Sequence, residues 1–450
     1  MRPIALHPDN GHYFLFRNKP AILLSSAEHY GALLNLDFDY KAYVRELKRF
    51  GLNQSRVFSG AYREVAGNFN IASNTLAPKP ERFCAPWPRT DTPGAADGLG
   101  KFDLGRWNDA YFRRLSDYCR EAGRHGVVLE LVLFCPFYED NMWAVSPMNA
   151  RNNVNGVGEM ARTDVYTLKD AKMLAIHDAL TRKLVDAVKG FDNVYFEIAN
   201  EPYFGGITME WQHHIADTIT DAQRGRSDKH LIAQNIANGS AEIKSPHPGV
   251  SVFNFHYASP PDAVRVNYGL NRVIAFDETG FAGTDDATYR TQAWEFLLAG
   301  GGGFSHLDYS FTAGGHEDGT FAYPKTQPGG GSRALRAQYK ILRDFMNGFD
   351  FLKMRPHNAA VAGNLPDGVR ATALAEPGKT YALYLNGGGG AAVPLVLDVP
   401  AGRWRAEWLD PATGAWNPAP KETDHAGGNL ALDVPGYTKD TALRLTRKGR

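Results

Sequence analysis

Short apolar runs and amphipathic segments alternate along the first three quarters of the chain. The runs are typical of strands covered on both faces, and the segments between them repeat their apolar positions with the period of a helix. We expect strands at 21–27, 52–59, 127–134, 193–199, 230–236, 252–257, 272–278 and 301–308. We expect helices at 38–50, 107–124, 165–189, 208–224, 288–298 and 332–346. This order predicts α/β architecture, with βα units that close into a (β/α)8 TIM barrel.

The pattern changes near residue 351 to short alternating runs separated by turns. Strands are expected at 368–373, 381–385, 393–397, 404–409 and 442–445. Such a series is typical of a small all-β sandwich. We therefore divide the chain into a barrel, residues 1–348, and a C-terminal β-sandwich, residues 349–450. Within the first part, a hairpin that turns at Asn10-Gly11 is expected to precede the barrel.

Two long segments show neither the period of a helix nor the pattern of a strand. Residues 60–105 follow the second predicted strand, and residues 135–163 follow the third. Unpatterned loops of this length in a compact domain usually cover an active site. The length of 450 residues suits a barrel of about 250 to 350 residues with one appended domain.

Charge and cysteine content exclude several classes of partner. The 49 basic and 49 acidic residues balance, and without a basic patch neither nucleic acid nor a membrane surface is expected as a partner. Three cysteines without ligand spacing predict neither a disulfide framework nor a metal site. The first residues lack the apolar core of a signal peptide. We expect a cytoplasmic protein, or a secreted or periplasmic one if a signal peptide has been removed.

Two of the predicted strands end in a glutamate. The run 193–199 stops at Asn200-Glu201-Pro202, because proline cannot continue the ladder, and the run from 272 stops at Asp277-Glu278. Barrel enzymes keep their chemistry at this end of the strands, and 77 residues between the glutamates leave room for three strand-to-strand steps. The alternative is that Glu201 caps a helix and Glu278 is a solvated loop acid.

These glutamates, with Asn200 and with Arg56 inside the second strand, resemble the clan A glycoside hydrolases. These are retaining (β/α)8 enzymes in which an acid/base glutamate follows asparagine on strand 4 and a nucleophile ends strand 7. The resemblance covers about the first three quarters of the chain and implies that Glu201 is the acid/base and Glu278 the nucleophile. It further implies that Asn200 binds the sugar 2-hydroxyl, and that no metal or organic cofactor takes part.

The resemblance also implies a supporting set around the nucleophile. Arg56 would lie beneath it and Tyr257 would donate to it, while His256 would line the same pocket. An arginine inside an apolar strand needs a buried anionic partner in any case. His256 and Tyr257 could instead be core residues with satisfied hydrogen bonds.

Further sugar-binding candidates lie at strand ends and in the long loops. Glu28 and His29 follow the first strand and could contact hydroxyls of the sugar nearest the scissile bond, although Glu28 could equally stabilise a helix N-terminus. Aromatic rings suit the apolar faces of sugars, and each ring could also be a packing residue. The remaining candidates are Trp143, Tyr203, Phe281, His306, Asp308 and Tyr309.

The sequence departs from the cellulase-like family 5 of this clan at two strands. The third strand ends in Cys135 without the histidine common in that family, and the eighth offers Phe304 and His306 where a tryptophan is usual. The clan resemblance rests on the two glutamates, Asn200 and Arg56, and includes family 5 and its neighbours.

We predict a retaining O-glycosidase that acts on a carbohydrate substrate, exo-acting because the long loops would wall one end of the cleft. The alternatives are a transglycosidase, and a non-catalytic carbohydrate-binding protein on the same scaffold. The sandwich could bind carbohydrate or support the barrel; the spacing of Trp404, Trp408 and Trp416 favours support. No oligomeric state is predicted.

Overall fold

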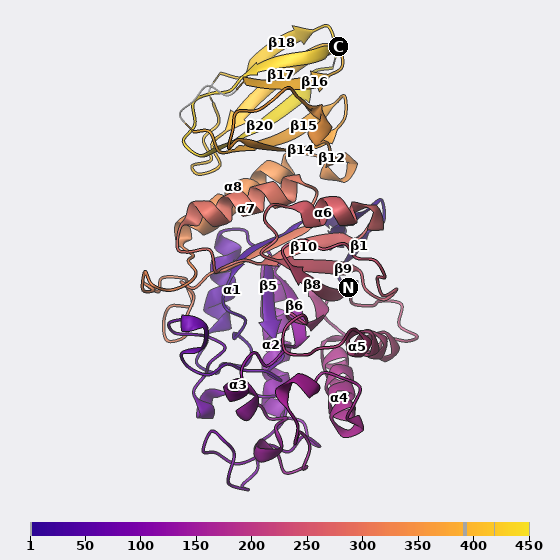
Figure 1. The fold of residues 1–450 in the computed structure, drawn as a ribbon, viewed down its shortest axis with the longest axis vertical. Coiled ribbons are helices and arrows are strands. Elements are labelled where there is room, and N and C mark those ends of the chain that lie inside the picture. Colours follow the sequence, from indigo (N-terminus) through magenta and orange to yellow (C-terminus); the bar gives the residue numbers. More distant parts are fainter. Residues whose placement is uncertain (1, 390–393, 418, 450) are drawn as a thin grey trace.

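A computed structural model of the protein describes residues 2–389, 394–417 and 419–449. Eight parallel strands form a nearly closed barrel surrounded by helices, with separate antiparallel sheets at the C-terminal end of the chain (Figure 1). The predicted fold class is therefore confirmed. None of the helices in the described part of the chain is both long and apolar enough to cross a membrane.

The barrel strands pair in the order β4-β11-β10-β9-β8-β7-β6-β5. They are β4 (Leu23–Ala27), β5 (Gln54–Phe58), β6 (Val128–Phe134), β7 (Val194–Ala199), β8 (Ile232–Asn238), β9 (Val252–His256), β10 (Val273–Glu278) and β11 (Gly303–Leu307). All eight predicted strands are present, and their bounds differ from the predicted ones by two residues or fewer. Most strand positions are buried, as expected for a sheet covered by side chains within and by helices outside.

The side chain of Asn53 joins the two strands at which the barrel closes. The backbone N–H of Leu24 in β4 donates to Asn53 Oδ1 at 2.8 Å, and Asn53 Nδ2 donates to the carbonyl of Ile22 at 2.9 Å. The Asn53 backbone N–H also donates to the carbonyl of Leu24, at 3.2 Å. These bonds substitute for a regular ladder between β4 and β5.

The longer helices, of ten residues or more, follow residues whose side chains cap them. The helices are α1 (Tyr40–Arg49), α2 (Asp109–His125), α3 (Asp140–Ala144), α4 (Ala171–Val188), α5 (Met209–Ala222), α6 (Asp262–Asn267), α7 (Asp286–Leu298) and α8 (Arg333–Asn347). The short helices α3 and α6 lack such a cap. The prediction that a helix starts at 165 was wrong. Asp170 caps α4 by accepting from the N–H of Met173 at 2.7 Å, so the helix begins six residues later.

The N-terminal hairpin turns at a different place from the one predicted. β1 (Ala5–His7) and β2 (Asn10–Phe16) are joined by a turn at Pro8-Asp9, and β3 (Lys19–Ala21) adds a third strand. Asn10 and Gly11 instead begin β2. A Cβ on Gly11 would lie 2.4 Å from the carbonyl oxygen of Asn271, so the glycine permits a close approach of two backbones.

The C-terminal strands form two antiparallel sheets next to α7 and α8 (Figure 1). One has the order β12-β14-β15-β20-β17-β18 and the other β13-β16-β19. The strands are β12 (Arg355–Pro356), β13 (Val361–Ala362), β14 (Arg370–Glu376), β15 (Thr380–Asn386), β16 (Pro394–Val399), β17 (Gly402–Leu409), β18 (Lys421–His425), β19 (Gly428–Asp433) and β20 (Asp440–Arg447). Of the predicted strand 393–397, residue 393 lies outside the described residues. The division at 348/349 stays a prediction.

The sandwich tryptophans are not equivalent. Trp404 and Trp408 are buried in the core between the two sheets, whereas Trp416 is 40% exposed. The guanidinium of Arg444 lies 4.5 Å from the Trp416 ring centroid, and Phe345 of α8 stacks on the same residue at 6.2 Å. Trp416 therefore packs against α8 at the junction with the barrel.

Candidate active site

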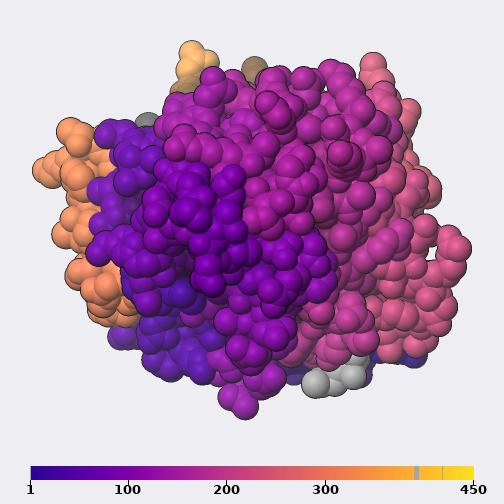
Figure 2. Space-filling view, turned by 90° about the horizontal axis from the view of Figure 1, so that it is seen from below, coloured from indigo at the N-terminus to yellow at the C-terminus, as the bar shows by residue number. Residues whose placement is uncertain are grey.

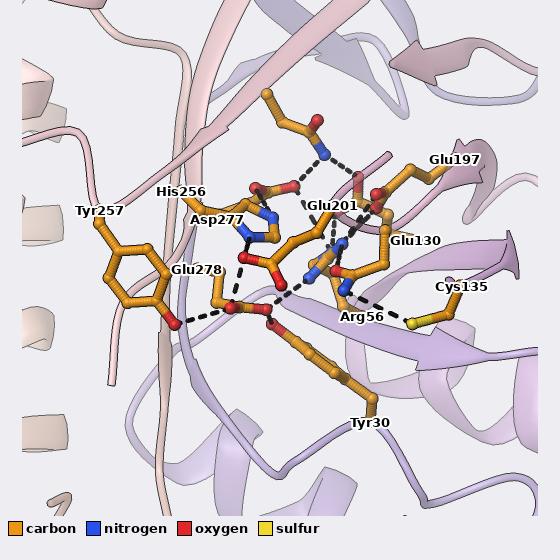
Figure 3. A network of polar contacts seen from close by, with 12 residues as sticks. Tyr30, Arg56, Glu130, Cys135, Glu197, Glu201, His256, Tyr257, Asp277 and Glu278 are labelled. Carbon is orange, nitrogen blue, oxygen red and sulfur yellow. Dashed lines mark hydrogen bonds and ion pairs between the residues drawn. The ribbon is translucent and has the colours of Figure 1, made fainter. Parts of the chain in front are cut away.

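Glu201 and Glu278 meet at the carboxyl ends of the barrel strands (Figure 3). Glu201 is the second residue after the end of β7, and Glu278 is the last residue of β10. One oxygen of each carboxylate and a ring nitrogen of His256 all lie within 4.8 Å of one another. His256 ends β9, and its Nδ1 is 3.3 Å from an oxygen of both glutamates.

Glu278 receives hydrogen bonds from several sides. The Tyr30 hydroxyl donates to Oε2 at 2.6 Å, and the Tyr257 hydroxyl donates to Oε1 at 2.8 Å. Arg56 Nη1 donates to Oε2 at a longer 3.4 Å. Each of these bonds favours the ionised carboxylate.

The charge state of Glu278 follows from these neighbours. Burial would raise its pKa, but the charge of His256, the hydrogen bond from His256, the charge of Arg56 and the Tyr30 hydroxyl together hold it below its usual value. Burial likewise works against a charged His256, and the carboxylates around it raise its pKa above the usual value. The geometry thus favours an ionised Glu278 beside a protonated imidazole.

Glu201 has a different set of partners. The Tyr138 hydroxyl donates to Oε2 at 2.5 Å, and the Tyr203 hydroxyl oxygen lies 3.4 Å from Oε1. Glu201 itself adopts φ +37°, a left-handed conformation that is uncommon outside glycine. The chain thereby turns sharply after the strand and directs the carboxylate toward Glu278 (Figure 3).

The side chain of Asn200 is held by Arg56 and Tyr138. Its Oδ1 accepts from Arg56 Nη2 at 2.9 Å, which leaves the amide nitrogen on the other side, where it donates to the Tyr138 hydroxyl at 2.9 Å. The Cys135 thiol lies 3.7 Å from the same nitrogen, and burial raises its pKa well above the usual range. This thiol is therefore neutral.

Beneath the pair, Arg56 is surrounded by acids from three other strands. It donates to Glu197 of β7 through Nε and Nη2 at 2.7 to 3.0 Å. Its Nε lies 3.8 Å from Glu130 of β6 and 3.5 Å from Asp277 of β10. Burial raises the pKa of both Glu130 and Glu197, and the charge of Asp277 adds to the rise at each.

Within the part of the chain that the structure describes, two groups of residues have oxygen or nitrogen atoms close enough to hold a metal ion: Glu201, His256 and Glu278, and Glu130, Glu197 and Asp277. The guanidinium of Arg56 already places a positive charge against all three acids of the second group. In the first group, both glutamates share the Nδ1 side of His256. We assign a metal to neither group.

A pocket of about 400 Å³ opens above the two glutamates. Its lining consists of His29, Tyr30, Phe58, Glu64, Phe69, Leu76, Cys135, Tyr138, Asn200, Glu201, Phe204, Asn238, Tyr257, Glu278 and Phe281. Several of them come from the loops that follow β5, β6 and β7. Seen from the end opposite the C-terminal sheets, the surface consists largely of the violet and magenta segments, to which the loops after β5 and β6 belong (Figure 2).

Some predicted site residues lie elsewhere. Arg56 and His256 contact the glutamates but are fully buried, so the expectation that His256 lines the pocket was wrong. The other candidates outside the pocket lining are Glu28, Trp143, Tyr203, His306, Asp308 and Tyr309. Glu28 accepts from the backbone N–H groups of Gly31 and Ala32 at 3.0 and 2.9 Å and from the Thr75 hydroxyl at 2.6 Å, which secures the loop after β4. Trp143 is buried, and its Nε1 donates to the carbonyl of Met160 at 3.0 Å.

His306 and Asp308 are part of a buried network away from the pocket. His306 Nδ1 lies 2.9 Å from the Ser26 hydroxyl, and burial lowers its pKa to about 4. Asp308 forms an ion pair with Arg336 at 2.5 Å. Tyr309 packs behind the lining, with its ring 5.6 Å from that of His29 and 6.2 Å from that of Phe281.

Sequence reasoning did not select Tyr30, Glu64 or Tyr138. All three lie in loops, where neither periodicity nor a strand end marks a residue. Glu197 and Glu130 did leave a signal, because each is a charged residue inside an apolar run and therefore requires a buried cation. That cation is Arg56.

No family model matches the sequence, and no curated protein matches it either. Solved structures do match. A glycoside hydrolase superposes with a TM-score of 0.65 at 15% identity, over 99% of this chain and 97% of that one. A glycoside hydrolase family 5 protein from Bacteroides vulgatus superposes at 0.66 and 15% identity, over 99% and 94%. A putative glycoside hydrolase from the same organism reaches 0.68 at 14% identity, over 99% and 82%.

The chain has the fold of the clan A glycoside hydrolases. Because these matches span nearly the whole chain, the likeness includes the C-terminal sheets as well as the barrel. An endo-1,4-beta-mannanase from Rhizomucor miehei superposes at 0.51 and 12% identity, over 77% of this chain and 100% of that one. Identities this low establish the fold, and the chemistry has to be argued from the site.

Proposed function

We propose that the protein is a retaining glycoside hydrolase, with Glu278 as the nucleophile and Glu201 as the acid/base. The observation that carries the proposal is the pair of strand-end carboxylates, whose oxygens approach within 4.8 Å of each other and both contact His256 Nδ1. Retaining enzymes need their two carboxyl groups about 5 to 5.5 Å apart, whereas inverting enzymes leave room for a water molecule between them. The short separation supports retention.

In the first step, a Glu278 oxygen attacks the anomeric carbon while Glu201 protonates the departing glycosidic oxygen. A covalent glycosyl-enzyme forms, and the aglycone leaves as an alcohol. In the second step, Glu201 takes a proton from water, whose oxygen displaces Glu278 from the anomeric carbon. Glu278 must be ionised at the start, which agrees with the depressed pKa that His256, Arg56 and Tyr30 cause against the effect of burial.

The neighbouring residues position the pair. Tyr30 and Tyr257 fix both oxygens of the nucleophile, and Tyr138 fixes the acid/base. Asn200, with its oxygen held by Arg56, presents its amide nitrogen toward Tyr138, where it can donate to the sugar 2-hydroxyl. A hydrogen bond to that hydroxyl strengthens in the oxocarbenium-like transition state.

Exo action on small glycosides is part of the proposal. The loops after β5, β6 and β7 contribute residues to a pocket of about 400 Å³. A volume of this order suits a small ligand more than several units of a polymer. Release of internal oligosaccharides from a polysaccharide as first products would contradict exo action.

The mechanism is tested with 4-nitrophenyl glycosides of glucose, mannose, galactose, xylose and fucose. We expect turnover of at least one of them, and Glu278→Gln should lower kcat by about a thousandfold or more, because no ionised nucleophile remains. Glu201→Ala should be rescued by azide with a glycosyl azide of retained configuration as product, detected by NMR. Glu210→Gln, an exposed change on α5, serves as the matched control.

Other outcomes would identify the alternatives. A protein that binds sugars but hydrolyses none of these glycosides, and is unaffected by Glu278→Gln, would be a carbohydrate-binding protein. Transfer to an added sugar in preference to water would identify a transglycosidase, which shares the same covalent intermediate.

A further inference from the structure

The two members of the catalytic pair have different pocket residues near them. On the side of Glu278, His29 forms an ion pair with Glu64 at 3.3 Å, and both side chains are buried. The His29 ring stacks on Tyr30 at 5.5 Å, and Tyr30 donates to Glu278. Charged side chains next to the nucleophile suit the hydroxyl groups of a sugar.

Near Glu201, Phe69 and Phe204 line the pocket, and we call this pair the phenylalanine wall. Phe69 and Phe204 pack against the ring of Tyr138 at 5.3 and 5.9 Å, and Tyr138 donates to Glu201. Phe204 is 43% exposed. Large exposed apolar side chains around a pocket mark a binding surface for an apolar group.

The backbone at Phe69 supports this interpretation. Phe69 lies between two asparagines and adopts φ +58°, a left-handed conformation that is disfavoured for an aromatic residue. Residues held in such conformations are found where the surrounding structure fixes them, often at binding sites. Here the strained loop holds the ring against Tyr138.

The proposed reaction determines which part of the substrate contacts the phenylalanine wall. The group that protonates a glycosidic oxygen has to touch it, so the leaving group lies beside Glu201 and hence beside Phe69 and Phe204. The polar side chains beside Glu201 are already bonded to one another: the Tyr138 hydroxyl donates to Glu201 and accepts from Asn200, and the Tyr203 hydroxyl donates to Asn238 Oδ1 at 2.5 Å. A second sugar would bring several hydroxyl groups to a surface with few partners for them, which is unfavourable.

We propose that the substrate is a single sugar unit joined to an apolar aglycone, aryl or alkyl, and that Phe69 and Phe204 form the aglycone site. This rests on the proposed function, because it takes Glu201 as the proton donor. The sugar occupies the part of the pocket above Glu278, and the aglycone extends toward Phe69 and Phe204.

The test uses alkyl glycosides of the sugar that the 4-nitrophenyl screen selects. Methyl, butyl, hexyl and octyl glycosides share the same scissile bond and nearly the same leaving-group acidity, so only aglycone contact differs. We expect kcat/KM to rise at least about tenfold from methyl to hexyl, since each buried methylene adds to binding. Disaccharides with the same non-reducing sugar should be poorer substrates than the hexyl glycoside. Phenyl and octyl glycosides, compared directly, distinguish an aromatic from a lipid-like aglycone.

Two variants test whether the phenylalanine wall causes the preference for longer alkyl aglycones. Phe204→Ser should reduce the hexyl-to-methyl ratio of kcat/KM at least about threefold, whereas Leu168→Ser, another exposed apolar residue, should leave the ratio as it is. A flat chain-length series, a preference for disaccharides or an unchanged ratio in Phe204→Ser would overturn the aglycone site while leaving the proposed hydrolase in place. No hydrolysis of any glycoside would overturn the proposed function, and this inference with it.

Discussion

Three residues of the candidate site have left-handed backbone conformations. Tyr30, Glu201 and Tyr257 have φ of +58°, +37° and +51°. Such conformations are uncommon outside glycine and cost free energy, so they persist where neighbouring contacts fix them. At each of the three positions the conformation directs a side chain into the same small space (Figure 3). The strain thus falls on the residues that hold or carry the proposed chemistry.

Tyr30→Phe tests the support of the nucleophile. The change removes the 2.6 Å hydrogen bond to Glu278 but keeps the ring against Phe58. A hydrogen bond to a charged group contributes about 1.5 to 3 kcal/mol, so kcat/KM should fall at least about tenfold. Because the hydroxyl helps to lower the pKa of Glu278, its loss raises that pKa, and the acid limb of the kcat/KM profile moves to higher pH.

The matched control for this change is Tyr323→Phe, which removes a hydroxyl that bonds the carbonyl of Gly331 away from the pocket. Its pH profile should match that of the unmodified protein. An unshifted acid limb in Tyr30→Phe would contradict the role of the hydroxyl.

Whether a site residue can be recognised in the sequence depends on whether it lies at a strand or in a loop. Glu201 and Glu278 stand out because each ends an apolar run, and Arg56 because it interrupts one. Tyr30 and Tyr138 reach the glutamates only through loop conformations that no periodicity encodes. Trp143 was expected at the rim because it lies in a long loop, yet that loop folds back and buries it.

At the scale of the elements, the end of β11 is connected to α8 by a buried ion pair. Asp308 accepts from Arg336 Nη1 at 2.5 Å and from the Ser26 hydroxyl at 3.0 Å. Burial would raise the pKa of Asp308, but the charge of Arg336, aided by His306 and Ser310, lowers it. The pair therefore links two barrel strands to the last barrel helix.

Asp308→Asn should lower the free energy of unfolding by about 3 to 5 kcal/mol at pH 7, because it leaves a buried arginine without its counter-charge. The folded-state pKa of Asp308 lies below its unfolded value of about 3.9, so the contribution is complete above that value and is lost as the pH falls through the folded pKa. Urea unfolding at pH 7 and pH 3 should therefore show a smaller difference between variant and unmodified protein at pH 3.

Asp344→Asn is the control, because Asp344 pairs with Lys340 and Arg343 at the surface. It should cost less than about 1 kcal/mol. An Asp308→Asn penalty that is equal at both pH values would show that the ion pair does not contribute to acid sensitivity.

The strands β6, β7, β9 and β10 could be predicted because each is a compact, mainly apolar run, as expected for a strand that is buried on both faces. The hairpin turn was misplaced because Asn10-Gly11 has turn composition while serving a tertiary contact with Asn271. β18 and β19 were missed, since both are rich in polar residues and exposed positions. Their pairing is determined by β17 and β16, not by their own sequence.

At the scale of the whole molecule, α7 joins the barrel to the C-terminal sheets (Figure 1). Trp294 of α7 stacks on Tyr384 of β15 at 5.3 Å. Beside it, Arg290 forms two hydrogen bonds to Asp440 of β20 at 2.7 and 3.0 Å, and Tyr384 donates to the same carboxylate at 2.8 Å. Apolar and ionic contacts thus fix the sheets against the same helix.

Asp440→Asn tests whether this junction couples the two parts. Arg290 and Asp440 are nearly fully buried, so loss of the charge leaves Arg290 uncompensated, at a cost of about 3 kcal/mol or more. The sheets should then unfold at a lower temperature than the barrel, and calorimetry should show a first transition about 6 °C or more below the midpoint of the unmodified protein. Lys439→Ala, next in sequence but exposed and 3.7 Å from Asp285, should change the midpoint little. A single unshifted transition in Asp440→Asn would mean that the packing of Trp294 on Tyr384 is sufficient to couple the two parts.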